Sequence, residues 1–339
     1  MDRGWSRTPR SIIHKMPKAW QVHRWCEPEE MTFAEIPLPE PGPGEVRVRN
    51  LASAINFFDI LQIQGKYQVK PPFPFTAGAE VAGVIDGVGE GVNGWKRGDE
   101  VVALPWGGGF AEFSVAQANR VWPLPQGMSA VEAASMPIVY HTSWFALTHR
   151  AALKAGEWLL VHAGASGVGM SAIQIGAALG ARVIATAGSA AKLDFCRAQG
   201  ALYALDYSNP EWVDQVKGIT GGGANVIYDP VGADIFDLST KCIAAEGRLL
   251  VIGFAGGRIP TVAANRVLLK NISIVGVLWG GYVANRPEYL AATQESLVRW
   301  FHEGRIRPVV GPTYALDEVP AALRDLANRR VLGKAVIAL

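Results

Sequence analysis

Cysteine is scarce in this chain of 339 residues, which contains only Cys26, Cys196 and Cys242. They lie far apart and form no C-x-x-C pair, so neither a disulfide framework nor a zinc-ribbon spacing is available. Long hydrophobic runs are also missing, because Gly, Lys or Arg interrupts each one well short of the roughly 20 residues that a membrane helix needs. These absences predict a soluble protein of a reducing compartment, which we expect to be the cytoplasm.

A surplus of charge of one sign is absent as well, since 32 Lys and Arg balance 30 Asp and Glu. A formal charge of +2 disfavours nucleic acid as a partner. With 49% hydrophobic and 18% charged residues, the composition is that of a globular protein with a buried core. The length fits two domains, at roughly 150 residues each.

The first residues are polar and lack the apolar segment of a secretory signal. We interpret residues 1–17 as a disordered extension or the product of a misplaced start codon. A transit peptide is the lesser alternative, because Asp2 is the only acid in residues 1–15.

Short β-type runs separated by Pro and Gly dominate the first part of the chain. Val46 and Val48 alternate with Arg47 and Arg49, which is typical of a half-buried antiparallel strand. We expect strands at 19–23, 31–36, 45–51, 80–88 and 100–104. The pattern predicts a β-barrel or β-sandwich domain.

After residue 125 apolar strands alternate with helices, which predicts a parallel sheet covered on both faces. The expected elements are helices 128–136 and 142–150, followed by strands 157–163, 182–187, 226–229, 248–253 and 272–279, with helices 167–180, 190–200 and 236–244 between them. A helix at 287–303 and a strand at 333–339 leave this pattern. We therefore assign 18–140 and 288–339 to the first domain and 141–287 to the second.

The strongest motif is a strand, a glycine-rich turn and a helix in the segment EWLLVHAGASGVGMSAIQIGAALG. Gly164 permits the turn, Gly167 lets the backbone approach a pyrophosphate, and Gly169 lets the helix pack on the strand. Ser166 replaces the middle glycine of the usual pattern and leaves a hydroxyl within reach of phosphate. With Val168 at the helix N-terminus, these residues predict a dinucleotide site.

The end of the next strand indicates which dinucleotide is bound. An NAD site carries an acid there for the ribose 2′-hydroxyl, but residues 184–189 contain none. Ser189 and Lys192 instead offer a hydroxyl and a cation to a 2′-phosphate. The sequence therefore predicts NADPH, although Lys192 could also be an ordinary surface lysine.

Several motifs in order and spacing resemble one enzyme family. They are AINFFDILQIQGKY at 54–67, PFTAGAEVAGV at 74–84, VGEGV at 88–92, GDEV at 98–101, the glycine-rich turn, DPVG at 229–232 and Gly333-Lys334. Over about residues 18–339 the chain resembles the zinc-independent quinone oxidoreductases, or zeta-crystallin-like proteins, of the medium-chain dehydrogenase/reductase superfamily. The resemblance implies a GroES-like β-barrel domain, a Rossmann domain, a substrate cleft between them and a homodimer formed through the edge of the Rossmann sheet.

Zinc relatives of this family carry a cysteine and a histidine that this chain lacks, since Asn56 and Ala79 stand in those regions. None of the six histidines is spaced to replace such a site. His162 lies in an apolar strand and is expected to be a buried core histidine. We therefore expect no metal.

The resemblance places Asn56 and Tyr67 at the nicotinamide end of the cleft, where they could hydrogen-bond a carbonyl oxygen that gains negative charge. Tyr67 could equally be an aromatic that closes a turn. Thr142 matches a family threonine near the carboxamide, or is an ordinary helix hydroxyl. Asp59 is expected to orient the loop through backbone hydrogen bonds.

The resemblance also adds cofactor-site residues. Tyr207 matches a tyrosine near the 2′-phosphate, against a reading as a strand aromatic. Two segments end strands on the side where parallel sheets bind ligands, and the family motif near the C-terminus completes the set. These residues are Gly253, Phe254, Leu278, Trp279, Gly333 and Lys334.

The leading hypothesis is an enzyme that transfers hydride from NADPH to a quinone or similar activated acceptor, in one- or two-electron fashion. An enone or enoyl-thioester reductase is the nearest alternative, and Arg258, Arg266 and Lys270 would supply cations for coenzyme A phosphates. A second alternative is a zeta-crystallin-like NADPH- or RNA-binding protein with little turnover.

Overall fold

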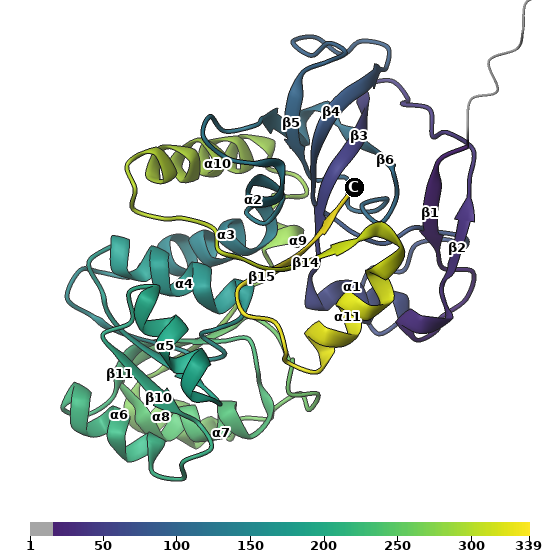
Figure 1. The fold of residues 1–339 in the computed structure, drawn as a ribbon. Coiled ribbons are helices and arrows are strands. Elements are labelled where there is room, and N and C mark those ends of the chain that lie inside the picture. Colours follow the sequence, from purple (N-terminus) through teal and green to yellow (C-terminus); the bar gives the residue numbers. More distant parts are fainter. Residues whose placement is uncertain (1–15) are drawn as a thin grey trace, which may run out of the picture.

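A single long strand, β3 (Glu45–Ala54), organises the first lobe of the computed structural model, which describes residues 16–339 (Figure 1). Val46 and Val48 are fully buried while Arg49 is exposed, so the predicted alternation is confirmed. β3 pairs antiparallel with three strands, β4 (Val81–Val88), β6 (Phe113–Gln117) and β15 (Lys334–Ala338). The end of the chain thus returns to the first lobe.

The rest of the first lobe surrounds this centre, and its seven-stranded sheet runs β14-β15-β3-β4-β5-β7 with β6 on β3. The remaining elements are β1 (Lys18–Gln21), β2 (Thr32–Glu35), β5 (Glu100–Ala103), β7 (Val121–Pro123), β14 (Val310–Ala315), α1 (Phe57–Ile63) and α11 (Val319–Ala327). Neither α1 nor α11 was predicted from the sequence. β14 pairs parallel to β15, so the lobe is not purely antiparallel.

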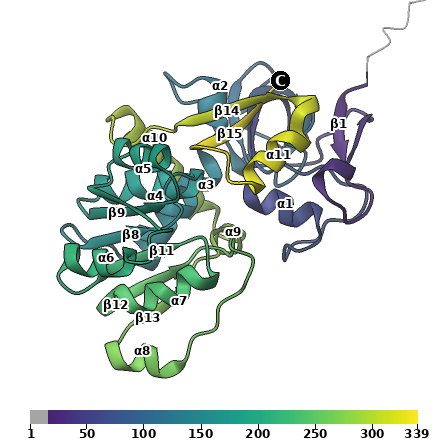
Figure 2. The same cartoon turned by 60° about the horizontal axis from the view of Figure 1, so that its bottom comes forward.

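The second lobe is built on six parallel strands in the order β10-β9-β8-β11-β12-β13. Its strands are β8 (Trp158–Val161), β9 (Arg182–Ala187), β10 (Tyr203–Asp206), β11 (Ala224–Asp229), β12 (Ile243–Val251) and β13 (Ser273–Gly276), and its helices are α4 (Gly167–Ala178), α5 (Ala190–Ala198), α6 (Trp212–Thr220), α7 (Ala233–Cys242) and α8 (Ala264–Lys270). α4 and α5 cover one face, and α6, α7 and α8 cover the other (Figure 2). Sequence reasoning missed β10, α6 and α8.

Alternate residues of β8 show why both faces need cover. Leu159 and Val161 belong to the core cluster shared with α4, whereas Trp158 and Leu160 belong to the cluster on the α6 and α7 side. All four are buried, which is typical of a central strand in a parallel sheet. Together with the first lobe, this architecture confirms the predicted fold class.

Helices join the two lobes: α2 (Ala130–Ala134), α3 (Pro137–Trp144) with a π-helix at Phe145–Arg150, α9 (Trp279–Val283) and α10 (Pro287–His302). The predicted helix 142–150 starts earlier because Pro137 occupies the first helical turn, where its missing N–H has no consequence. Trp300 of α10 packs on Trp144 with ring centroids 4.8 Å apart. The assigned domain boundaries stay predictions. Of the extension expected over residues 1–17, residues 1–15 lie outside the described residues.

Within residues 16–339, every helix is too short or too polar to cross a lipid bilayer.

Candidate active site

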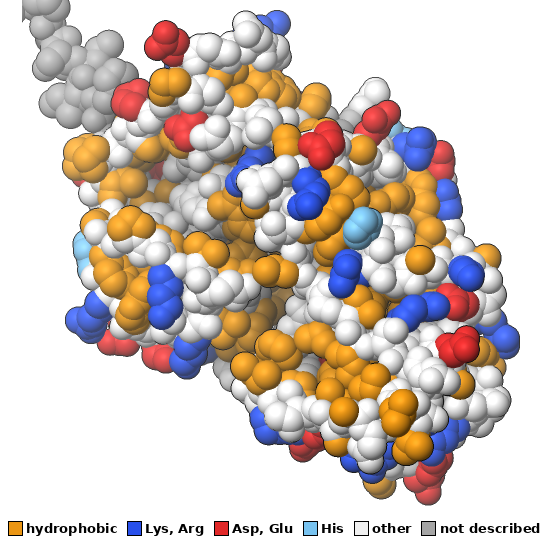
Figure 3. All heavy atoms as spheres, turned by 180° about the vertical axis from the view of Figure 1, so that it is seen from behind, with side chains coloured by type: hydrophobic (Ala, Val, Ile, Leu, Met, Phe, Trp, Pro, Cys, Tyr) orange, Lys and Arg blue, Asp and Glu red, His pale blue; other side chains and the backbone are white. Residues whose placement is uncertain are grey.

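A cavity of about 780 Å³ lies between the two lobes and is lined by residues of both. Figure 3 shows the hollow between the lobes with hydrophobic side chains around it. Most residues predicted for the site line this cavity: Asn56, Tyr67, Thr142, Ser166, Gly167, Val168, Lys192, Tyr207, Gly253, Phe254, Leu278, Trp279, Gly333 and Lys334. Segments far apart in the sequence are therefore brought together as expected for one site.

Three predicted residues do not line the cavity, and each has a visible place elsewhere. A Cβ on Gly164 would meet Cys196 Sγ at 2.8 Å, and one on Gly169 would meet the carbonyl oxygen of Ala163 at 2.2 Å. At both positions the absence of a side chain lets the turn pack closely against its neighbours. Ser189 is exposed at the N-cap of α5. A direct contact of these three with a cofactor stays a prediction.

The turn between β8 and α4 offers an unpaired backbone donor to the cavity. Ser166 caps α4: its hydroxyl donates to the carbonyl oxygen of Ala163 (2.7 Å) and accepts from the Gly169 N–H (3.1 Å). The hydroxyl predicted to reach phosphate is thus already engaged. The N–H group of Val168 has no hydrogen-bond partner in the part of the chain that the structure describes, whereas Gly167 follows Ser166, which pairs with Gly333 in an isolated parallel bridge. At a helix N-terminus, such a free donor suits a pyrophosphate.

One end of the cavity holds two cations. Lys192 of α5 donates from Nζ to the backbone carbonyl of Arg329, and both side chains line the cavity. Partial burial and the Arg329 guanidinium lower the pKa of Lys192. Neither cation pairs with a carboxylate among residues 16–339. Two adjacent unpaired cations fit a dianion such as a ribose 2′-phosphate.

Arg329 was missed by sequence reasoning, because only the fold brings the loop after α11 beside α5. The tyrosine at this end was predicted. A Cβ on Gly188 would meet the Tyr207 hydroxyl at 2.6 Å, so this ring lies directly over the turn after β9. β9 ends without an acid, and Asp234, the one carboxylate-bearing residue among residues 16–339 that lines the cavity, is paired with Arg258 at 2.8 Å. This end therefore fits the predicted preference for NADPH.

The other end of the cavity carries two neutral donors, Asn56 and Tyr67, and Lys66 also lines it there. Asn56 precedes α1 and donates from Nδ2 to Glu80 Oε1 (2.8 Å). Tyr67 follows α1, and its ring lies tilted beside that of Phe58, with ring centroids 5.3 Å apart. Burial and the Asp59 carboxylate raise the pKa of Tyr67, so the phenol remains a donor at neutral pH. Its hydroxyl, like that of Thr142, makes no hydrogen bond within the described chain.

Aromatic side chains form the walls beside these donors. Trp106, which sequence reasoning did not single out, lies with its ring centroid 5.7 Å from that of Trp279. Phe254 and Leu278 are 39% and 55% exposed at the cavity mouth. The arrangement suits a flat, apolar acceptor.

The buried histidines are held neutral. His162 contacts Thr186 Oγ1 at 2.9 Å and Ser239 Oγ at 2.8 Å, and burial lowers its pKa to about 3. It is a core histidine bound to two hydroxyls, as expected. Across residues 16–339, the His, Cys, Asp and Glu side chains form no group of three or more that could hold a metal ion.

Comparisons with known proteins give the same two parts. The sequence profile described as alcohol dehydrogenase GroES-like domain matches residues 42–126, and that described as zinc-binding dehydrogenase matches residues 167–295. Quinone oxidoreductase-like protein 2 of Bos taurus is 40% identical over 299 residues, covering 88% of this chain and 86% of that protein. A quinone oxidoreductase of Pseudomonas aeruginosa is 34% identical over 325 residues, covering 95% and 99%.

The likeness extends to a solved structure. Escherichia coli quinone oxidoreductase, crystallised with NADPH, superposes with a TM-score of 0.88 at 28% identity, covering 95% of this chain and 100% of that one. The similarity therefore spans both lobes and the cavity between them.

Proposed function

Because this chain belongs to the quinone oxidoreductase family of the medium-chain dehydrogenase/reductase superfamily, we propose that it reduces a quinone, or a similarly activated carbonyl compound, with NADPH. One observation carries the proposal: a single cavity has the two cations Lys192 and Arg329 at one end and the neutral donors of Asn56 and Tyr67 beside aromatic walls at the other. The first end suits a 2′-phosphate and the second a carbonyl oxygen.

The residues that would hold the cofactor follow from this geometry. Val168, beside Gly167, would donate its N–H group to the pyrophosphate at the start of α4. Lys192 and Arg329 would take the 2′-phosphate, with Tyr207 beside them. When bound, NADPH supplies the hydride.

At the other end, the chain's own residues would receive the acceptor. Its carbonyl oxygen gains negative charge on reduction, and Asn56 Nδ2 and the Tyr67 hydroxyl can donate hydrogen bonds to that charge. The raised pKa of Tyr67 keeps the phenol protonated, so it acts there as a hydrogen-bond donor. Trp106 and Trp279 keep water away from the reacting oxygen.

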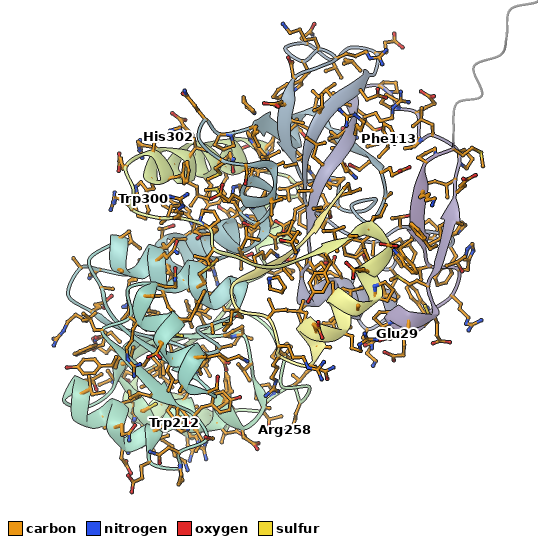
Figure 4. All side chains as sticks on the ribbon, in the orientation of Figure 1. Glu29, Phe113, Trp212, Arg258, Trp300 and His302 are labelled. Carbon is orange, nitrogen blue, oxygen red and sulfur yellow. The ribbon has the colours of Figure 1, made fainter. Side chains whose placement is uncertain are left out.

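The coenzyme A thioester alternative is weakened by where the cations lie. Arg258 pairs with Asp234 and Asp237 (2.8 and 2.6 Å), at the lower edge of the second lobe in Figure 4. Lys270 donates to two backbone carbonyls at the end of α7, the nearer at 3.0 Å, and Arg266 donates to Thr240 at 3.1 Å. Among the residues that line the cavity, none of these three cations is found. A free enone fits the apolar walls as well as a quinone does.

We also propose a homodimer through β13, the edge strand of the sheet. Leu268 and Leu269 of the adjacent α8 are 73% and 78% exposed, and exposed apolar groups beside an open edge favour association. Sedimentation should give a dimer that the double change Leu268→Lys and Leu269→Lys dissociates. Leu202→Lys, a 60% exposed leucine beside the opposite edge strand β10, is the matched control.

The testing experiment is the initial rate of NADPH oxidation with a quinone, a free enone and a coenzyme A enoyl thioester, with NADH alongside. Fast quinone reduction that prefers NADPH supports the proposal. Preference for the enone or thioester would move the function to double-bond reduction. NADPH binding without turnover on any acceptor would refute reduction and favour the binding alternative, which salt-sensitive RNA binding would strengthen.

A further inference from the structure

A fully buried ion pair lies in the wall of the cavity, beside the neutral donors. Lys334 Nζ is 2.8 Å from Glu80 Oε1, and the two side chains are 3% and 0% exposed. Burying two charges is unfavourable unless their mutual attraction and hydrogen bonds offset the lost hydration. Lys334 begins β15 and lines the cavity, so the pair stands next to the reacting end and not in a remote core.

Oxygen atoms of the chain itself surround the Lys334 ammonium. It donates hydrogen bonds to the backbone carbonyl of Ile55 (2.8 Å) and to Asn56 Oδ1, and it forms the ion pair with Glu80 Oε1. The aliphatic stem alone approaches the phosphate turn, where a Cβ on Gly167 would meet Lys334 Cδ at 3.0 Å. The ammonium therefore acts on Asn56 and not directly on a ligand.

The ion pair fixes the Asn56 amide in one orientation. Its oxygen faces the ammonium of Lys334, and its nitrogen faces the carboxylate of Glu80 at 2.8 Å. A half-turn of the amide would place N–H against N–H and oxygen against oxygen, losing both bonds. The second oxygen of Glu80 is held by the Ile138 N–H at 2.7 Å, so the carboxylate cannot follow such a turn.

This orientation leaves one N–H of Asn56 Nδ2 without an acceptor among the described residues, on a side chain that lines the cavity. A cation on the amide oxygen draws electron density from the amide nitrogen, which makes that N–H a stronger donor. We propose that Lys334 is a positioning residue that orients and polarises the Asn56 amide toward the acceptor oxygen that gains charge on reduction. The inference rests on the proposed reduction of a carbonyl compound.

A double-mutant cycle between Lys334 and Asn56 tests this role. Lys334→Met keeps the volume and removes the charge, and it should lower kcat about 10- to 100-fold while the KM for the acceptor and the Kd for NADPH change less than about threefold. In the background of Asn56→Ala, Lys334→Met should cost almost nothing further, because its effect passes through the missing amide. The loss should be larger for an enone than for an easily reduced quinone.

Two outcomes would overturn the positioning role. Equal kcat losses with and without Asn56 would show that Lys334 acts independently of the amide, and a tenfold rise in the Kd for NADPH, measured by fluorescence titration, would assign it to the cofactor. If Lys334→Met does not fold because Glu80 is left unpaired, the double variant Lys334→Met with Glu80→Gln replaces it throughout the cycle. Recovery of wild-type kcat in that uncharged double variant would also overturn the role.

The failure of this inference can be told apart from the failure of the proposed function. Absence of turnover in the wild type would refute the proposed function itself, whereas turnover with additive losses would refute only the positioning role.

Discussion

A methyl group at Gly169 would stand 2.2 Å from the carbonyl oxygen of Ala163, so the first turn of α4 lies directly on the turn that leaves β8. Gly167 and Val168, which precede Gly169 in this first turn, line the cavity. The phosphate end of the site therefore depends on a residue that does not line it.

Gly169→Ala should displace α4 from the turn. Because the obstructing atom is backbone and cannot rotate away, we expect a loss of about 1–3 kcal/mol in the free energy of unfolding and at least a tenfold weaker Kd for NADPH. Urea unfolding and fluorescence titration measure the two effects. Gly218→Ala in α6 is the control, since its Cβ would meet nothing within 4 Å. That change should stabilise the protein by about 0.5–1 kcal/mol, and unchanged NADPH binding by Gly169→Ala would contradict the prediction.

Ser166→Ala separates capping from phosphate binding. The Ser166 hydroxyl is bonded to Ala163 and Gly169, so its removal should lower the free energy of unfolding by about 1 kcal/mol. The Kd for NADPH should change less than about threefold. Ser166→Gly should cost only a few tenths of a kcal/mol, because glycine is tolerated at the cap. A tenfold weaker Kd with unchanged stability would instead place the hydroxyl on the phosphate.

Lys192→Ala and Arg329→Ala should each raise the KM for NADPH about 10- to 100-fold and leave that for NADH almost unchanged. The reason is that only NADPH carries the 2′-phosphate that the two cations would bind. Initial rates with each cofactor give both constants. Lys154→Ala, an exposed lysine before β8, is the control and should change neither. Equal effects on NADPH and NADH would remove the substituted residue from the 2′-phosphate site.

Much of this site could be predicted because its signals are local in sequence. A few consecutive residues are enough to predict a dinucleotide site from the glycine-rich turn and NADPH from the acid-free end of β9. The alternation of Val46 and Val48 with arginines likewise predicts β3. Arg329 and Trp106 carry no such signal. They reach the cavity only because the loop after α11 meets α5 and because Trp106 packs on Trp279.

The difference between local sequence signals and contacts that only the fold creates also explains the prediction made for Lys334. As a lysine after Gly333, it matched a family motif and was predicted to bind the cofactor. The fold places Glu80 and Asn56 around its ammonium, from strands and turns more than 200 residues away. Such a pairing has no local pattern, because neither residue type is unusual at its own position in the sequence.

Asp59 of α1 lies between Asn56 and Tyr67 in the sequence and is fully buried, and burial raises its pKa to about 7. One oxygen accepts the Asn56 backbone N–H at 2.7 Å, and the backbone N–H groups of Asn56 and Gly78 both lower the pKa of Asp59. The Lys334 ammonium lowers the pKa of Asp59 and the Glu80 carboxylate raises it, but neither outweighs burial. The Tyr67 phenol faces it as well.

The sign of the pH dependence follows from these values. In the unfolded chain Asp59 ionises near pH 4, whereas in the folded protein it holds its proton up to about pH 7. Between these values the folded state binds more protons, so stability falls as pH rises through the window, by up to about 4 kcal/mol. Asp59→Asn keeps the shape and the acceptor for Asn56 but has no charge to bury. Urea unfolding from pH 4 to pH 8 measures the free energy of unfolding of both proteins. The difference between Asp59→Asn and the wild type should shift in favour of the variant as pH rises and become constant above about pH 7.

The exposed Asp194→Asn is the control, and its difference from the wild type should not depend on pH. A difference between Asp59→Asn and the wild type that is the same at every pH would mean that Asp59 does not titrate in this window.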